Sequence, residues 1–259
     1  MKVIKADGTE EKFKKKKIIS TCKRAGKDEK TAKKIADKIK KKVKNKTSTK
    51  KIYNLIVKEL KKHKDPTSLI YKLREAIAEL KPKRFEDYAK DILESRGYDC
   101  KVRKIIKGKI VEHEIDVVAK KDGKTFLVEV KRHKNPHRYC GLGTVMEIWA
   151  RFDDINKKKK MFDRIWMFVN TKFSEHAKRY GKGKNMILTG WRTNRDHSLE
   201  KMIVKKDFPV TILDISKKSK EKLQKNNILT LNQLLNTKKL PIKEKKSSKN
   251  QANHIIKAI

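Results

Sequence analysis

Two apolar, strand-like segments separated by a tight turn constrain the fold of this chain more than any other feature. Residues 114–119 and 125–131 are rich in β-branched and aromatic side chains, as strands are. The Lys-Asp-Gly-Lys segment at 121–124 contains the Asp-Gly pair that is typical of a short hairpin turn. The sequence therefore predicts an antiparallel hairpin over residues 114–131.

Each predicted strand carries two charged side chains at alternate positions. Because side chains alternate between the two faces of a strand, Glu129 and Lys131 share one face, and Glu114 and Asp116 share one face of the partner strand. Carboxylates that converge in this way repel one another unless a cation joins them, and a hard divalent metal bound by Asp116 and Glu129 would do so. The alternative is a solvated hairpin face with ordinary ion pairs, since lysine is very common in this chain.

The order Asp-x12-Glu-x-Lys resembles the active site of the PD-(D/E)xK nucleases. Residues 85–98 resemble the first amphipathic helix of Mrr-like restriction endonucleases, with Gly97 near its end. Residues 165–177 are similar to that family's later strand and the helix that follows it. The resemblance covers residues 82 to 200 in the family's order. Many Mrr-like proteins carry Gln where this chain has Glu129, which leaves the subfamily open.

The resemblance implies a metal-dependent DNA endonuclease. Asp116 and Glu129 would be the ligands of Mg²⁺ or Mn²⁺, and Lys131 would orient the attacking water and stabilise the developing charge. Glu86 on the first helix would be an auxiliary carboxylate facing the same site. His133 follows on the face of Lys131, where it would be solvated or would contact a phosphate.

The first 80 residues predict a hairpin followed by four helices. Turn and strand residues predict strands at 1–6 and 9–13 on either side of Asp7-Gly8. Apolar residues at helical spacing and N-cap residues predict helices over 17–25 and 30–44, from Thr49, and from Pro66.

That succession resembles the ATP-cone, the nucleotide-sensing module best known from ribonucleotide reductases. The matching positions are Val3 to Gly8, Glu11, Phe13, Lys17, Ile18, Ala25, Gly26, Thr49, Ile52 and Tyr71. The family usually has arginine where this chain has Ala6, so one phosphate or ribose contact would be missing.

The resemblance implies that ATP or dATP binds this module as a regulatory ligand. Its implied contacts are Lys5, Glu11, Lys14, Lys17 and Thr49. Lysines at a hairpin mouth and a threonine at a helix N-terminus suit a triphosphate. No Walker-type glycine loop occurs, so the sequence favours regulation over ATP hydrolysis. The alternative is a small basic domain that contacts DNA or a partner subunit.

Beyond residue 208 the composition changes. Residues 211–235 resemble a helix-hairpin-helix unit that lacks the usual glycines, with Asn227 available for the left-handed turn. A generic pair of helices packed on the nuclease core is the alternative. The residues from Lys243 are mostly polar and predict a tail, although Ile255, Ile256 and Ile259 would suit a final docked helical turn.

Composition restricts the partners. The formal net charge of +41 favours attraction to polyphosphate, although the charge is spread along the whole chain and also suits a general bias such as thermophily. Three widely spaced cysteines exclude a zinc ribbon and favour reduced thiols. No run of apolar residues is long enough to span a bilayer, and no signal core precedes the first strand. We therefore expect a cytoplasmic protein with no membrane partner.

Together these features predict an α/β chain in four parts. A small helical ATP-cone with an N-terminal β-hairpin would occupy 1–80, and a restriction-endonuclease-like mixed sheet flanked by helices 82–205. A short helical region would occupy 208–240 and a polar tail 241–259. The predicted function is ATP- or dATP-regulated cleavage of DNA by a homo-oligomer, in restriction or repair. A junction-resolving nuclease on the same fold, or a nucleotide-responsive DNA-binding regulator with an inert nuclease fold, are the alternatives.

Overall fold

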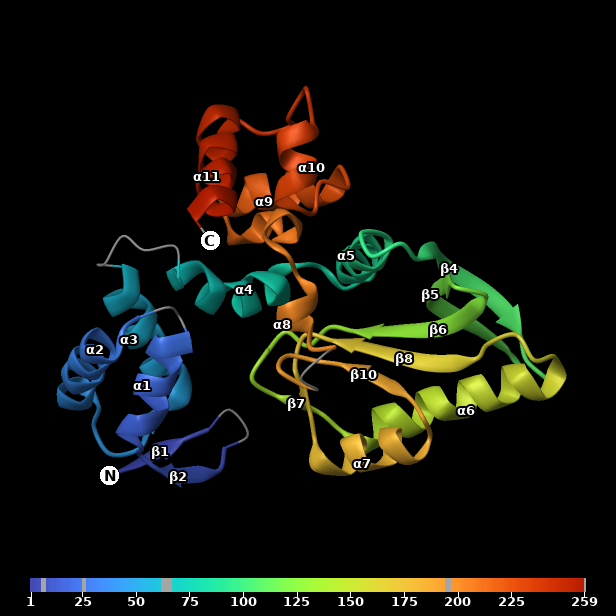
Figure 1. Ribbon diagram of the computed structural model, residues 1–259, viewed down its shortest axis with the longest axis horizontal. Helices are drawn as coiled ribbons and strands as arrows, with labels where there is room; N and C mark the ends of the chain where they lie inside the picture. The colour runs from blue at the N-terminus through green and yellow to red at the C-terminus, as the bar shows by residue number, and fades with distance from the viewer. Residues whose placement is uncertain (6–7, 25–26, 62–66, 194–196, 259) are drawn as a thin grey trace. The chain divides into compact units, whose positions relative to one another are not determined.

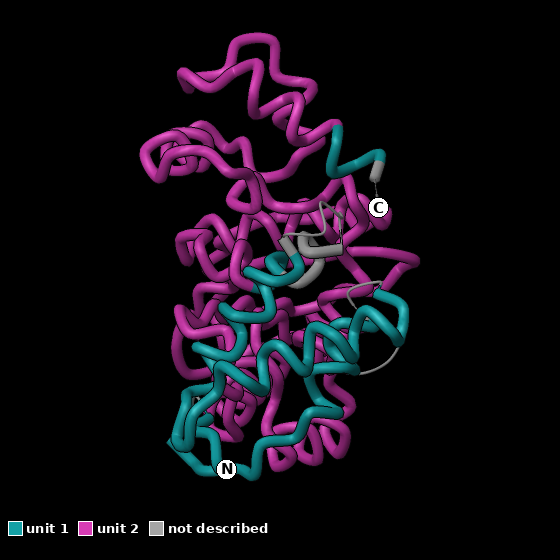
Figure 2. Tube along the Cα trace, turned by 90° about the vertical axis from the view of Figure 1, so that its left-hand side faces the viewer, with its two compact units in different colours: residues 1–74, 254–259 teal, residues 75–253 magenta. Residues whose placement is uncertain are grey.

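A computed structural model describes residues 1–5, 8–24, 27–61, 67–193 and 197–258, with the side chains of 24, 61, 67–71 and 258 left aside. The chain forms two compact units (Figures 1 and 2). Met1–Arg74 with His254–Ile259 form unit 1, and Glu75–Asn253 form unit 2. Ala6, Asp7, Ala25, Gly26 and Pro66 lie outside the described residues, as does the side chain of Tyr71.

Unit 1 has a small sheet and a core of helices. Strands β1 (Lys2–Ile4) and β2 (Glu10–Lys12) form the predicted antiparallel hairpin, and β3 (Thr47–Ser48) pairs with β1 in parallel. The helices are α1 (Lys15–Arg24), α2 (Glu29–Lys42) and α3 (Thr49–Lys61). The apolar stripes predicted from the sequence form one buried core, which includes Ile18, Cys22, Ile35, Ile39, Ile56 and Leu60.

Unit 2 is built on a five-stranded mixed sheet in the order β10-β8-β6-β5-β4. Its strands are β4 (Asp99–Lys107), β5 (Glu112–Lys121), β6 (Lys124–Lys131), β8 (Arg164–Val169) and β10 (Ile187–Thr189). Strands β4, β5 and β6 are antiparallel neighbours, whereas β6, β8 and β10 run in parallel. The turn at Asp122 and Gly123 has φ of 50° and 72°, as the predicted Asp-Gly hairpin requires.

Helices cover both faces of this sheet (Figure 1). On one face, α6 (Leu142–Lys158) and α7 (Glu175–Gly183) pack on a core that includes Ile115, Leu127, Ile148, Ile155, Met167 and Leu188. Helix α5 (Pro82–Glu94) packs on β4, β5 and β6 and is followed by Gly97, whose φ of 80° is that of the predicted glycine C-cap. A short parallel pair, β7 (Tyr139–Cys140) and β9 (Lys172–Phe173), lies outside the main sheet.

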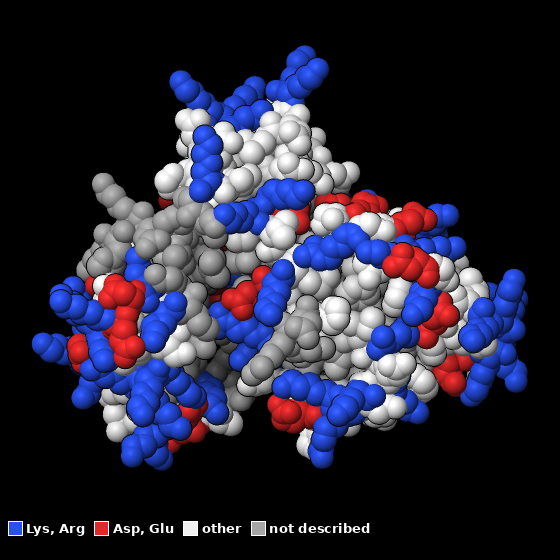
Figure 3. Space-filling view, viewed as in Figure 1, with Lys and Arg blue, Asp and Glu red and all other residues white. Residues whose placement is uncertain are grey.

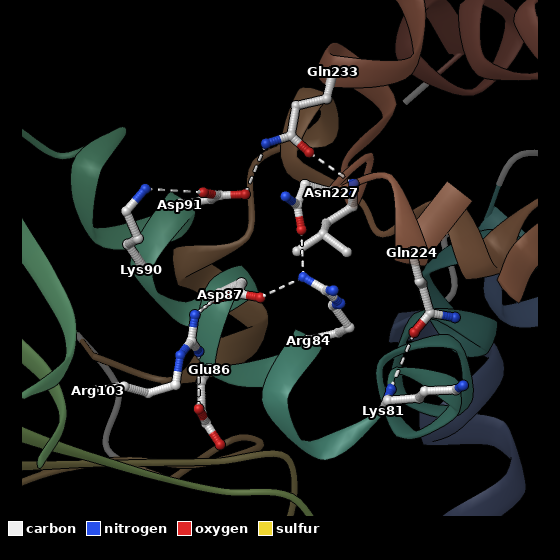
Figure 4. Close-up of polar contacts among 11 residues, drawn as sticks. Lys81, Arg84, Glu86, Asp87, Lys90, Asp91, Arg103, Gln224, Asn227 and Gln233 are labelled. Atoms are coloured by element: carbon white, nitrogen blue, oxygen red, sulfur yellow. Dashed lines mark hydrogen bonds and ion pairs between the residues drawn. The ribbon is translucent and has the colours of Figure 1, made fainter. Parts of the chain in front are cut away.

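The C-terminal helices are fastened to α5 by polar contacts (Figure 4). Helix α9 (Lys217–Lys225) supplies Gln224, which accepts a hydrogen bond from the Lys81 backbone N–H at 3.1 Å. Helix α10 (Leu231–Asn236) supplies Gln233, whose amide donates to Asp91 at 2.8 Å. Asn227, in the turn between these helices, has the left-handed φ of 57° that was predicted for it.

Other short elements complete the chain. They are α4 (Thr67–Glu79), which runs across the division between the units, α8 (Leu199–Met202), the 3-10 helices η1 (Lys205–Asp207) and η2 (Val210–Ile212), and α11 (Lys245–Ala258). All three cysteines are free and buried. No helix in the described part of the chain has the length and apolarity needed to cross a membrane.

The structure contains several elements for which the sequence analysis had no strand or helix, and two of them have a clear physical reason. Strand β4 is one, because its interleaved lysines hide the apolar alternation of an edge strand. Helix α11 is the other, and it occupies the segment expected to be a polar tail. Ser248 and Ala252, four residues apart, are fully buried, and Gln251 accepts a hydrogen bond from the Asp214 N–H at 2.8 Å.

Candidate active site and nucleotide site

Asp116 and Glu129 face each other on adjacent strands. Val117 of β5 pairs with Val128 of β6, so the next residues outward, Asp116 and Glu129, stand opposite each other on one face. The Asp116 carboxylate accepts the backbone N–H of Val130 at 2.8 Å. That bond fixes the carboxylate beside β6, one residue before the exposed Lys131.

Glu129 is buried and Asp116 is half-buried, so both carboxyl groups are shielded from water. Glu129 is only 4% exposed, and burial together with the neighbouring Asp116 raises its pKa to about 8. Burial raises the pKa of Asp116 to about 6, and the carboxylate of Glu86 adds to this. Arg151 and Lys131 lower both pKa values but do not cancel the effect. The neighbouring cations are therefore too few to keep both carboxyl groups ionised at their usual pKa values.

Arg151 is a site residue that the sequence analysis did not single out. It lies on α6, where its Nη1 is 3.7 Å from Glu129 Oε2 and its Nη2 donates to Glu147 Oε1 at 2.6 Å. The available signal was its position three residues after Ile148 and four before Ile155, in the stripe of α6 that faces the sheet. An arginine in an apolar stripe indicates a buried acidic partner.

The two carboxylates fit a divalent cation such as Mg²⁺. Glu129 Oε2 is buried and has no hydrogen-bond partner, because Arg151 lies beyond hydrogen-bond distance. The described residues include no cluster of three or more histidine, cysteine, aspartate or glutamate side chains that would hold a metal. A site of two carboxylates suits Mg²⁺, which is typically bound by one or two carboxylates while substrate phosphate and water complete its shell.

Glu86 and Glu114 have different surroundings. Glu86 accepts a hydrogen bond from Arg103 Nη1 at 3.1 Å, and the same guanidinium donates to Asp87 at 2.7 Å (Figure 4). Its carboxylate is still close enough to raise the pKa of Asp116. Glu114 is exposed and shares none of these contacts. Glu86 is therefore close enough to Asp116 to affect its charge, whereas Glu114 is exposed and lies outside this group of side chains.

His133 follows strand β6, two residues beyond Lys131. The side-chain amide of the fully buried Asn170 accepts from the His133 N–H at 2.7 Å and donates to the His133 carbonyl at 2.8 Å, as a neighbouring strand would. Burial and the nearby Arg138 and Lys131 lower the pKa of the imidazole, whose buried Nε2 has no hydrogen-bond partner. His133 is therefore a neutral polar group beside Lys131.

The predicted nucleotide contacts gather around the β1–β2 hairpin of unit 1. Glu11 forms an ion pair with Lys17 and lies 3.6 Å from Lys5 Nζ. The hydrogen bond from Lys17 lowers the pKa of Glu11, and Lys14 is close enough to contribute. Ile4 pairs with Ser48 in parallel, so the following residues, Lys5 and Thr49, leave adjacent strand ends where α3 begins. The structure thus brings the side chains of Lys5, Glu11 and Lys17 together, with Thr49 beside the end of β1, whereas Lys14 follows β2 at the opposite end of the hairpin.

Comparisons with known proteins find the same two modules. The ATP cone domain model matches residues 1–72, and the restriction endonuclease model Mrr_cat matches residues 77–192. An uncharacterized protein of Archaeoglobus fulgidus is 35% identical over 166 residues, which cover 64% of this chain and 94% of that protein. The crystal structure of a protein of unknown function, AF1548, is similar with a TM-score of 0.60 and 30% identity, over 69% of this chain and 100% of that chain.

The family models and the sheet agree with the resemblances drawn from the sequence, and the archaeal relative is similar over almost its whole length. This chain therefore belongs to the same family as that archaeal protein, and contains an ATP cone domain followed by an Mrr-like restriction endonuclease domain of the PD-(D/E)xK superfamily.

Proposed function

We propose that this protein is a metal-dependent DNA endonuclease that is regulated by ATP or dATP bound to its cone. The observation that carries the proposal is the buried Asp116–Glu129 pair, whose charges have no adequate counter-cation and whose Glu129 Oε2 has no hydrogen-bond partner. If this carboxylate had only a structural role, other groups of the protein would supply its hydrogen bonds. This pair instead has the chemistry of a site prepared for a divalent ion.

In this proposal Asp116 and Glu129 hold Mg²⁺ or Mn²⁺. The bound ion would supply Lewis-acid polarisation of the phosphate and would lower the pKa of water. The exposed Lys131 ammonium would orient the attacking water and stabilise the negative charge that develops on the phosphate. Arg151 would give the Glu129 carboxylate a second cationic neighbour.

The electrostatics of the surface support DNA as the substrate. Lysine and arginine side chains are spread over the face in Figure 3, with groups of acidic side chains among them, and the formal net charge of the chain is +41. Such a distribution favours binding to phosphates without reading their sequence. Cleavage rather than mere binding is favoured because a DNA-binding regulator has no need of buried carboxylates that repel its ligand.

The regulatory part of the proposal is supported by helix α4. The last residues of α4 are held by the loop that follows Lys131: Arg132 donates to the Ala78 carbonyl at 2.8 Å, and His137 Nε2 is 2.8 Å from Glu75. Thr211 also donates to the Ala76 carbonyl at 2.6 Å. Because α4 begins among the residues matched by the ATP cone model, a change in its position would reach the catalytic strand.

The test is cleavage of supercoiled plasmid by the full chain, with and without Mg²⁺ and with ATP, dATP or no nucleotide. We expect nicked or linear DNA only when the metal is present, at a rate that depends on the nucleotide. Binding without any cleavage, under Mg²⁺ and Mn²⁺ and with every nucleotide, would favour the inert DNA-binding regulator instead.

A further inference from the structure

The turn between β4 and β5 carries exposed aliphatic side chains. Ile110 is 83% exposed, Ile105 is 73% exposed and Val111 is 51% exposed. Single exposed aliphatic residues are ordinary on a protein surface, but here three lie at the end of one hairpin. Strand β4 is an edge of its sheet, and Ile106 packs on the core, so Ile105 points away from it. We call residues 105–111 the hairpin tip.

The hairpin tip is held rigidly by Asp154 of α6. The Asp154 carboxylate accepts the backbone N–H of Ile110 at 2.9 Å and of Val111 at 3.3 Å, and it lies 2.8 Å from His113 Nε2. The Asp154 carbonyl accepts the N–H of residue 109 at 3.0 Å. A Cβ at Gly108 would meet Asp154 Oδ2 at 2.0 Å, so glycine permits this close approach. The exposed side chains are therefore presented on a preorganised backbone, which lowers the entropy cost of binding.

Lysines surround the hairpin tip. Lys101, Lys104, Lys107 and Lys109 are exposed. The only acidic residues of the adjoining part of β5 are Glu112 and Glu114. A second copy of the chain would place lysine against lysine at this surface, which disfavours self-association through it. The partner that suits this surface is a polyanion whose apolar interior can be reached through a groove. Such a partner would contact both the exposed aliphatic side chains and the lysines.

We propose that the hairpin tip enters the minor groove of the DNA substrate and inserts an aliphatic side chain, foremost Ile110, between two base pairs. The surrounding lysines would contact phosphates on either side of that groove. The inference rests on the proposed function, and extends it by naming how the substrate is held. It also names a specificity: steps that unstack easily, such as TA or CA, and mismatched steps would be preferred.

The hairpin tip is close enough to act on the DNA segment that is cut. Ile110 lies six residues from Asp116 along the chain, so the two are at most about 20 Å apart. That distance corresponds to about six base pairs along one strand. Insertion would therefore bend and unstack the duplex within a few base pairs of the bond to be hydrolysed, which orients the phosphate toward Asp116 and Glu129.

The experiment uses the full chain without divalent metal, so that the DNA stays intact, and a set of duplexes with 2-aminopurine placed at successive positions. The parent protein should raise the fluorescence at one or two neighbouring positions, because the probe is unstacked there. Ile110→Ser should abolish the rise and weaken binding about tenfold, whereas Ile110→Met should retain the rise. Val204→Ser removes an aliphatic side chain that is 44% exposed elsewhere in unit 2, and should behave as the parent.

Three results would overturn the inference. They are the absence of a rise at every position, an unchanged rise in Ile110→Ser, and a loss of oligomer mass in Ile110→Ser without DNA, which would make the hairpin tip a subunit contact. The nuclease proposal is tested separately. Unstacking by a parent that never cleaves with Mg²⁺ supports insertion and contradicts the nuclease, whereas cleavage without unstacking does the reverse.

Discussion

At the scale of single residues, the burial and mutual repulsion of the Asp116 and Glu129 carboxyl groups have a chemical consequence. Burial raises the pKa of Glu129 to about 8, so Glu129 retains its proton near neutrality when no metal is present, whereas Asp116, with a pKa raised to about 6, is mostly ionised there. A divalent ion must displace the Glu129 proton in order to bind both carboxylates. Metal affinity and proton release are therefore linked at this pair.

The first prediction concerns the proposed ligand Asp116. In Asp116→Asn the amide oxygen can still accept the Val130 N–H, so the hairpin should persist, but the ionic metal ligand is lost. We expect Mg²⁺-dependent cleavage to fall by at least about a hundredfold, with DNA affinity changed less than about twofold, because phosphate contacts are spread over many lysines. Gel-based cleavage and fluorescence anisotropy measure the two quantities. Glu114→Gln, an exposed change on the same strand, is the control and should cleave as the parent does.

The second prediction concerns pH and stability. Because burial raises the pKa of Glu129 to about 8 and of Asp116 to about 6, these groups favour the folded state at pH 4 and progressively lose that contribution as the pH rises to 8. The free energy of unfolding of metal-free protein should therefore decline over this range, and Mg²⁺ should oppose the decline by binding the charged pair.

Urea titrations followed by tryptophan fluorescence measure this for unit 2 alone, since Trp149, Trp166 and Trp191 all lie there. In Glu129→Gln the free energy of unfolding should decline less between pH 4 and pH 8. A parent and a Glu129→Gln variant with the same pH dependence would contradict the assigned direction of the shift.

The sequence could predict part of this site. Alternation along two strands is a local property, so Asp116, Glu129 and Lys131 could be grouped before the fold was known. Arg151 and Arg103 could not, because they come from another helix and from the unpredicted strand β4, and only tertiary packing brings them near the carboxylates.

At the scale of helices and strands, local patterns succeeded where the apolar spacing was regular. The β5–β6 hairpin, strand β8 and the helices of unit 1 all follow that spacing. Strand β4 was missed because an edge strand rich in lysine has little alternation to detect. Helix α11 was missed over most of its length because its buried face includes Ser248 and Ala252, which hydropathy barely registers, whereas Ile255, expected to dock a final helical turn, is buried.

The third prediction concerns helix α4. Arg132→Ala removes the hydrogen bond that ties the loop after Lys131 to the Ala78 carbonyl. We expect the cone to bind ATP with the parent affinity, while the cleavage rate no longer responds to nucleotide. Calorimetry and cleavage assays measure the two quantities. Lys134→Ala removes the same charge from an exposed position nearby and should keep the response. A normal response in Arg132→Ala would mean that the signal does not pass through this contact.

The fourth prediction concerns the start of helix α10. Gln233 accepts the N–H of Leu229 at 2.7 Å and of Thr230 at 3.1 Å, and it also donates to Asp91. Gln233→Ala should lower the free energy of unfolding of unit 2 by about 1–2 kcal/mol, because it removes a capping box and a partner of a half-buried carboxylate. Urea titration measures it, and Asn232→Ala on the exposed side of α10 should cost less than about 0.5 kcal/mol.

At the scale of the whole molecule, a nuclease with one metal site in each chain, as proposed, would cut one strand at a time. Double-strand cleavage would then need two copies, and a nucleotide-binding cone would offer a means of controlling their assembly. In the proposed function the two units would carry these two tasks in one chain, and the net charge of +41 would favour binding to DNA.

The fifth prediction follows. ATP, dATP and ADP should give different oligomer distributions and different rates of double-strand cleavage, and DNA should change nucleotide affinity by the same factor, typically about 5- to 150-fold. Light scattering and cleavage on one sample, at fixed salt, measure this. Identical mass and identical rate under every nucleotide would leave the cone without a regulatory role.

The contacts between the C-terminal helices and α5 affect the order in which the protein can fold during its synthesis. Lys81 bonds to a residue 143 positions later, and Asp91 to one 142 positions later. Because synthesis proceeds from the N-terminus, α5 emerges long before the helices that hold it. A growing chain can thus form the residues matched by the ATP cone model, and the strands on which α5 packs, before these two contacts of α5 exist. In the proposed function, full cutting activity should therefore appear only once the C-terminal helices have been made, which would spare DNA from an unfinished chain.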